Sequence, residues 1–297
     1  MMRPDSVAVT GITFYPNWYR GSLRSIGDAD KVRGDLALDS IAAGIRNGYR
    51  MVVADGASSS AFKDELSQLA GLTLVERRGM ERAEGRRQGY VVASGINGVE
   101  AIIKTELEKL QVVQRDIPEL VSPIIRQDAV IVVGKRNPTL HQQTYPEYQW
   151  ESEVEANARF NELLHQTGLL PQGESLDMFF GPVAFANRPD ILGLFLEKYQ
   201  FTLPSDSGIR KYVNPEDWSD GYFFSIVKAL HQGLNVQSVE VDFHYPDLQR
   251  RNEETSDKGA VDIAKEKRAK QKWGLLDELV HFIRYLRDDP KSGLIRL

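Results

Sequence analysis

Short apolar runs alternate with segments of helical spacing along the first half of the chain. The apolar positions Leu36, Ile41 and Ile45 follow the helical period and predict a helix over 35–46. Strands and helices that alternate in this order are typical of βαβ units, so the sequence predicts an α/β fold with a mainly parallel sheet. The runs that predict strands are rich in aliphatic residues and end at glycine or polar residues; they cover 6–13, 49–54, 72–75, 128–136 and a run beginning at Ala101.

The second half of the chain is less regular. Residues 249–272 are highly charged and predict a solvated helix or a linker. Residues 273–286 place their apolar side chains on one side and predict an amphipathic helix, which would pack on the domain or on a second subunit. The other predicted elements are helices over 151–167, 190–199 and 222–232, and strand-like segments over 177–186 and 236–243.

One apolar run ends in two carboxylates, Glu106 and Glu108, with Lys104 and Lys109 on either side. A buried strand that ends at acids predicts a polar crevice at a sheet edge, where ligands of open α/β sheets bind. Two carboxylates at such an edge are suited to a divalent cation that bridges a substrate diphosphate. The alternative is a solvated Glu/Lys turn at the end of a strand.

Composition narrows the class of protein. The chain has 297 residues, of which 41% are hydrophobic and 27% charged, as in an ordinary soluble globule. Its net charge of -5 does not indicate a nucleic-acid-binding protein. The absence of cysteine excludes disulfides and thiolate metal sites. No apolar run reaches the ~20 residues of a transmembrane helix, and the N-terminus lacks a signal-peptide core. We therefore expect a cytoplasmic enzyme or binding protein.

Read in order, several motifs resemble the GT-A class of nucleotide-sugar glycosyltransferases, including family 2-like and mannosylglycerate synthase-like members. Asp55 follows the second predicted strand. Residues 77–90 form an arginine-bearing loop that leads into a helix, and Glu106-Leu107-Glu108 stands where the class carries its D-x-D motif. A later strand ends in Gly134-Lys135-Arg136, close to the Gly-x-Arg of the class. The resemblance covers roughly residues 6–247 by the order and spacing of these motifs. Glutamate stands at both acidic positions, where aspartate is usual.

The resemblance implies a GT-A type, Rossmann-like sheet flanked by helices. It implies a catalytic domain over 1–247, with a nucleotide-binding half of about 1–137 and an acceptor half of about 138–247. A charged linker and an amphipathic C-terminal helix would follow over 248–297, and this helix is a candidate for homodimer contacts.

The activity that the resemblance implies is a metal-dependent transfer of a hexose from a UDP- or GDP-sugar to a small polar acceptor. The metal would be Mg²⁺ or Mn²⁺. Two alternatives stay open: a sugar-phosphate nucleotidyltransferase, and a sugar-nucleotide or carbohydrate-binding protein without turnover. The first of these usually has a Gly-rich, basic loop after the first strand, whereas this chain has Phe14 to Tyr19 there.

Individual residues have structural alternatives as well. The metal ligands are predicted to be Glu106, Glu108 and His244, although a histidine after a strand more often bonds a loop carbonyl. The acceptor base is predicted to be Asp217 or Asp220, although Asp220 could instead cap the following helix. The donor-binding candidates, some of which could serve in turns or surface ion pairs, are Thr13, Tyr15, Asp55, Arg78, Arg87, Thr105 and Asp177.

Overall fold

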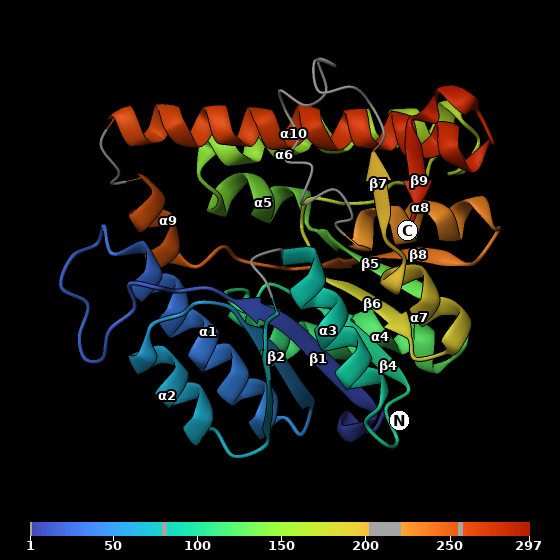
Figure 1. The fold of residues 1–297 in the computed structure, drawn as a ribbon. Helices are drawn as coiled ribbons and strands as arrows, with labels where there is room; N and C mark the ends of the chain where they lie inside the picture. Colours follow the sequence, from blue (N-terminus) through green and yellow to red (C-terminus); the bar gives the residue numbers. More distant parts are fainter. Residues whose placement is uncertain (1, 79–81, 202–220, 255–257) are drawn as a thin grey trace.

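The structure, a computed structural model, describes residues 2–78, 82–201, 221–254 and 258–297. Its centre is a seven-stranded sheet with the order β3-β2-β1-β4-β6-β5-β8 (Figure 1). Every pair is parallel except those of β6, which runs antiparallel to both neighbours. The predicted α/β fold with a mainly parallel sheet is therefore confirmed. The strands are β1 (Val7–Thr13), β2 (Arg50–Asp55), β3 (Leu72–Glu76), β4 (Ala101–Lys104), β5 (Ile131–Arg136), β6 (Val183–Ala186) and β8 (Val236–Val241).

The central strands read as continuous apolar runs because both of their faces are covered. All four residues of β4 and of β6 are buried, and so are six of the seven in β1. Such runs are expected of parallel strands that lie between two layers of helices. β3, at the edge of the sheet, has no fully buried residue.

Two layers of helices follow from the chain direction. Between β1 and β3 the chain moves toward one edge of the sheet, and α1 and α2 pack together on that path. From β3 it returns to β4 on the far side of β1, so a right-handed crossover places α3 on the opposite face. There α3, α7 and α8 pack together. The helices are α1 (Ala29–Arg46), α2 (Ser60–Gln68), α3 (Arg82–Ser94), α4 (Ile117–Ile125), α7 (Pro189–Leu196) and α8 (Gly221–His231).

The reversal of direction makes β1 and β4 neighbours whose connections leave toward opposite edges of the sheet. Such a switch point opens a crevice at the carboxyl ends of the two strands. The main chain continues the pairing past the end of β4, because the amide of Thr105 donates to the carbonyl of Thr10 over 3.0 Å. The predicted acidic motif begins one residue later and therefore lies at this crevice.

The C-terminal part of the chain packs on two separate parts of the fold. α9 (Asp247–Glu254) packs on α1, and the long helix α10 (Lys258–Leu286) runs along α6 (Glu147–Gln166), as Figure 1 shows. The charged stretch predicted over 249–272 thus begins in α9, and its later part shares α10 with the predicted amphipathic segment. α10 packs on the domain, and a homodimer through it stays a prediction. The remaining elements are α5 (Pro138–Thr144), the short helices η1 (Pro4–Ser6), η2 (Val112–Asp116) and η4 (Pro290–Ser292), and the antiparallel pair β7 (Tyr199–Phe201) and β9 (Leu294–Arg296).

No helix within the described ranges is both long and apolar enough to cross a membrane.

Candidate active site

Leu107, the middle residue of the acidic motif, sets the direction of the two acids. It is fully buried and packs on Gly11 of β1, where an added Cβ would lie only 2.5 Å from its Cγ. Only glycine leaves room for this contact. Anchoring Leu107 on β1 holds Glu106 and Glu108 at the carboxyl ends of β1 and β4, on either side of the anchored residue.

Glu108 is bound by an arginine from α1. Nη2 of Arg33 lies 2.6 Å from Oε1 of Glu108, whose side chain is almost completely buried. The Glu108 carboxylate raises the pKa of Arg33 well above its usual value. Burial and the same carboxylate raise the pKa of Tyr15, so this phenol keeps its proton. Tyr15, Arg33 and Glu108 therefore form one group beside the end of β1, in which Tyr15 and Glu108 are buried and Arg33 is exposed.

Glu106 is exposed and lies between two lysines. Its carboxylate pairs with Nζ of Lys109, and a Cβ added at Gly181 would lie 3.6 Å from Nζ of Lys104 and 3.7 Å from Oε1 of Glu106. Enclosure in the crevice raises the pKa of Glu106, but the ammonium groups of Lys109 and Lys104 outweigh it, so the pKa lies well below its usual value. Lys104 also donates to the carbonyl of Gly181 over 3.0 Å and lies over the Tyr222 ring.

The end of β2 forms a second polar group beside β1. Asp55 is buried, and its Oδ1 accepts hydrogen bonds from the hydroxyls of Thr13 and Ser58 over 2.7 and 2.5 Å. The Ser58 hydroxyl in turn accepts the Tyr15 amide over 2.9 Å. Oδ2 of Asp55 has no hydrogen-bond partner and lies 3.8 Å from Nζ of Lys63. The predicted residues Thr13, Tyr15 and Asp55 are thus brought together.

Arg77 lies in a slot formed by two glycines next to this group. A Cβ at Gly56 would lie 2.7 Å from Nη2 of Arg77, and one at Gly85 would lie 2.6 Å from its Cδ. The guanidinium also lies 5.9 Å from the ring centroid of Phe14. Sequence reasoning selected other arginines of this loop, because the glycines that enclose Arg77 lie on two different elements.

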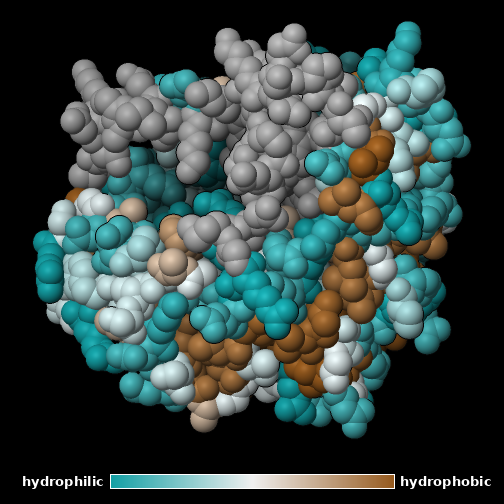
Figure 2. Space-filling view, viewed as in Figure 1, coloured by the Kyte–Doolittle hydropathy of each residue, from teal (hydrophilic) through white to brown (hydrophobic). Residues whose placement is uncertain are grey.

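Arg78 and Arg87, the predicted donor-binding arginines, line a cavity of about 870 Å³ between the end of β3, α3 and α7, and Arg77 lines it too. Arg87 is buried and donates to the carbonyl of Glu197 over 3.2 Å, whereas Arg78 is exposed. Apolar side chains line the cavity too, and Figure 2 shows a brown patch on this side of the molecule, where Val91 is among the exposed apolar residues.

The second half of the chain contributes a buried ionic network. Arg136, at the end of β5, binds both carboxylate oxygens of Asp177 over 2.7 Å and also pairs with Glu153 of α6. Asn157 donates to Asp177 as well, over 2.7 Å. Burial would raise the pKa of Asp177, but Arg136 holds it below its usual value. Asp177 therefore positions Arg136, while Arg268 of α10 reaches the same Glu153 over 3.1 Å.

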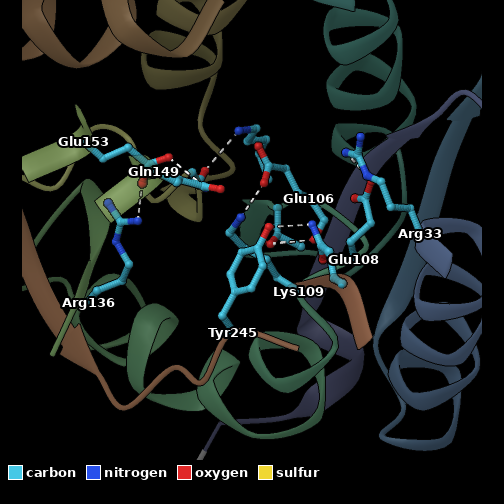
Figure 3. Close-up of polar contacts among 12 residues, drawn as sticks. Arg33, Glu106, Glu108, Lys109, Arg136, Gln149, Glu153 and Tyr245 are labelled. Atoms are coloured by element: carbon cyan, nitrogen blue, oxygen red, sulfur yellow. Dashed lines mark hydrogen bonds and ion pairs between the residues drawn. The ribbon is translucent and has the colours of Figure 1, made fainter. Parts of the chain in front are cut away.

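Figure 3 shows how these groups lie relative to one another. The Arg33–Glu108 pair lies on one side, Arg136 with Gln149 and Glu153 on the other, and Glu106, Lys109 and Tyr245 between them. Glu153 and Glu106 both contribute to raising the pKa of Lys109 against the effect of burial, which agrees with its central place. The groups thus lie near the ends of β4, β5 and β8.

The predicted metal ligands do not form a metal site as the structure arranges them. Among the described residues, no three His, Asp or Glu side chains are grouped so that they could hold an ion. Glu108 and Glu106 are paired with Arg33 and Lys109. His244 is exposed, and its amide donates to Gln111 over 3.1 Å. The donor set therefore does not fit a divalent cation without breaking these pairs.

Sequence reasoning located part of this site. Thr105 is buried beside the motif, whereas Asp217 and Asp220 lie outside the described residues. The sequence shows Lys104 and Lys109 on either side of the acids, but their positions in the sequence did not predict that they would take part in the site. Arg33 had no local signal, because it reaches Glu108 from a helix far earlier in the chain.

No family model and no curated protein sequence matches this chain. Solved structures of low identity are similar in arrangement. A protein described as a nucleotide-diphospho-sugar transferase, from Desulfovibrio desulfuricans G20, is 10% identical over 95% of this chain and 98% of its own, with a TM-score of 0.45. Glucosyl-3-phosphoglycerate synthase from Mycobacterium tuberculosis, in complex with phosphoglyceric acid, is 11% identical over 96% and 80%, with a TM-score of 0.48.

The same synthase, in complex with Mn²⁺, UDP and phosphoglyceric acid, is 11% identical over 93% of this chain and 78% of its own, with a TM-score of 0.46. These descriptions name the class of enzyme that the sequence motifs resemble. All three TM-scores lie below 0.5, so the activity of this chain has to be argued from its own site.

Proposed function

We propose that the protein is a glycosyltransferase that moves a hexose from a nucleoside diphosphate sugar to a small polar acceptor. The observation that carries the proposal is the place of the Glu106–Glu108 motif at the switch point between β1 and β4, with lysines beside it. Ligands of open α/β sheets bind at such points. Two lysines that lie close together there favour the binding of an anionic group. A diphosphate meets both conditions.

The donor would lie across the ends of β1, β2 and β4. Asp55 and Thr13 would form the floor under the base or ribose, with Arg77 beside them. Tyr15 and Thr105 would line the path between the nucleoside and the diphosphate, which would lie over Lys104 and Lys109. Arg78 and Arg87 lie in the neighbouring cavity, and we assign them to the far end of the donor or to its entry.

The chemistry needs stabilisation of a leaving group and a proton acceptor. As the bond between the sugar and the diphosphate breaks, negative charge grows on the phosphate oxygen that leaves. Ammonium groups already fixed in the crevice stabilise this charge without reorganising. Asp217 and Asp220 remain the proposed bases for the acceptor hydroxyl.

The acceptor would bind near Glu106 and Lys109, on the side where Arg136, Gln149 and Glu153 lie. These three side chains are buried and paired with one another, so they would form a fixed polar support for the acceptor. Polar groups fixed by other side chains suit an acceptor with several hydroxyl groups. We infer a small polar acceptor, and a donor that is a UDP- or GDP-sugar.

A turnover panel tests the proposal. The purified protein is incubated with UDP-, GDP-, ADP- and CDP-hexoses, with and without small hydroxylated acceptors such as glycerate and phosphoglycerate. Release of the nucleoside diphosphate is measured by chromatography, and the sugar product by mass spectrometry. We expect diphosphate release with one nucleotide class, increased by an acceptor.

Other outcomes point to the alternatives. Formation of nucleoside triphosphate and sugar 1-phosphate when pyrophosphate is added would contradict transfer and indicate a nucleotidyltransferase. Binding of a sugar nucleotide without turnover under any condition would indicate a binding protein.

A further inference from the structure

We propose that the chain's own cations, Lys109 and Lys104, neutralise the diphosphate of the donor in place of a divalent metal. The inference rests on the proposed function and concerns the same crevice. It departs from the metal dependence that the sequence resemblance implies. Three features of the described residues support it: both acids are paired, three cations lie around them, and no further metal ligand joins them.

Glu108 is the less available of the two acids. Its side chain is 9% exposed, and the 2.6 Å pair with Arg33 accounts for one carboxylate oxygen. A metal bound to Glu108 would sit next to the Arg33 guanidinium, or would displace it. A cation left beside a metal ion is repelled, and displacement of Arg33 would remove the guanidinium that pairs with the nearly buried Glu108 carboxylate.

Glu106 is accessible but already neutralised. Half of its side chain is exposed, whereas that of Lys109 is only 12% exposed. Lys109 is thus held under Glu106, at the floor of the crevice, by the rings of Phe180 and Phe243. The ammonium can exchange the carboxylate for a phosphate oxygen without a change in the backbone.

The two acids lie among cations. Lys109, Lys104 and Arg33 all lower the pKa of Glu106, and Arg33 also pairs with Glu108, so each carboxylate has a described cation beside it. A site for a divalent cation offers carboxylate oxygens to the metal instead. The other described residues supply no third His, Asp or Glu in position to complete such a site.

The proposed arrangement gives each cation a role. Lys109 contacts the diphosphate directly, and Lys104 adds its charge from the side of Gly181. Arg33 neutralises the second acid of the motif. Tyr15 adds a hydroxyl that keeps its proton beside Glu108. The result is the charge compensation that a metal supplies elsewhere, built from side chains of α1 and the β4 loop.

Calorimetric titration with UDP, GDP, ADP and CDP tests the inference, in EDTA and then with Mn²⁺ or Mg²⁺. We expect one diphosphate to bind in EDTA with an affinity that either metal changes by no more than about twofold. Lys109→Ala should weaken that binding by about tenfold or more, the usual effect of losing a charge-assisted hydrogen bond. Lys291→Ala, an exposed lysine near the C-terminus, is the matched control and should bind as wild type does.

Glu106→Gln separates the two accounts because they predict opposite signs. If Lys109 binds the phosphates, removing the competing carboxylate leaves the affinity unchanged or raises it. If Glu106 holds a metal, the same change lowers the affinity and abolishes its dependence on metal. Binding that requires Mn²⁺ or Mg²⁺ and is lost in Glu106→Gln overturns the inference and leaves the proposed function standing. No binding of any diphosphate under either condition overturns both.

Discussion

The Arg136–Asp177 pair offers the sharpest test of how the second half of the chain is held together. The side chain of Arg136 is 1% exposed, and Asp177 meets it with both carboxylate oxygens. Replacing Asp177 with alanine leaves the guanidinium buried with Glu153 as its remaining carboxylate. Breaking a buried pair from one side costs about 3–5 kcal/mol, a large share of the roughly 5–15 kcal/mol that stabilises a domain.

An exposed pair of the same residue types is the control. Arg188 and Asp190 lie 2.6 Å apart, with both side chains 56% exposed. Asp190→Ala should lower the free energy of unfolding by less than about 1 kcal/mol, because solvent screens such pairs. The assay is urea unfolding at neutral pH, followed by circular dichroism and tryptophan fluorescence. If Asp177→Ala costs no more than Asp190→Ala, the Arg136 network does not stabilise the fold as argued.

Three further changes have defined outcomes. Burial and a neighbouring arginine lower the pKa of His141 to about 3, so the unfolded chain binds a proton that the native state excludes. The resulting stability is complete above the unfolded pKa of about 6.5 and is lost toward pH 3 by up to about 1.4 kcal/mol per pH unit. His141→Phe should remove this part of the slope in unfolding measured from pH 7 to 4, and an unchanged slope would contradict it. Gly11→Ala places a methyl group against Leu107 and should cost about 1–3 kcal/mol while weakening diphosphate binding; wild-type binding would show that Leu107 does not orient the acids. Thr13→Val removes a donor to buried Asp55 and should cost about 1–3 kcal/mol, measured as a shift in the urea midpoint, and a smaller shift than that of the exposed control Asp190→Ala would refute the role of this bond.

The sequence predicted the strands of the sheet, but it did not predict the side-chain contacts between segments that are far apart in the chain. The apolar runs at β1, β2 and β4 are continuous because helices cover both faces, and this pattern is visible in one dimension. The acidic motif was likewise found from the place where β4 ends. Its partner Arg33 was not, because pairing of α1 with the β4 loop depends on how two distant segments meet in space.

The C-terminal helix illustrates the same limit. Residues 249–272 have no long apolar stripe, so the pattern predicted a solvated helix or a linker. In the structure, α10 lies along α6 through charged pairs, Arg268 with Glu153 and Lys272 with Glu155. A helix held partly by ion pairs leaves little hydrophobic signal in the sequence.

The most direct test of the account is a crystal structure with the diphosphate that binds in EDTA. We predict electron density for the diphosphate at the carboxyl ends of β1 and β4, with a phosphate oxygen within hydrogen-bond distance of Nζ of Lys109 and the Arg33–Glu108 pair intact. Density in the cavity between β3 and α3 alone, away from the acidic motif, would contradict the proposed donor site. So would the absence of any bound diphosphate at a concentration well above its measured dissociation constant.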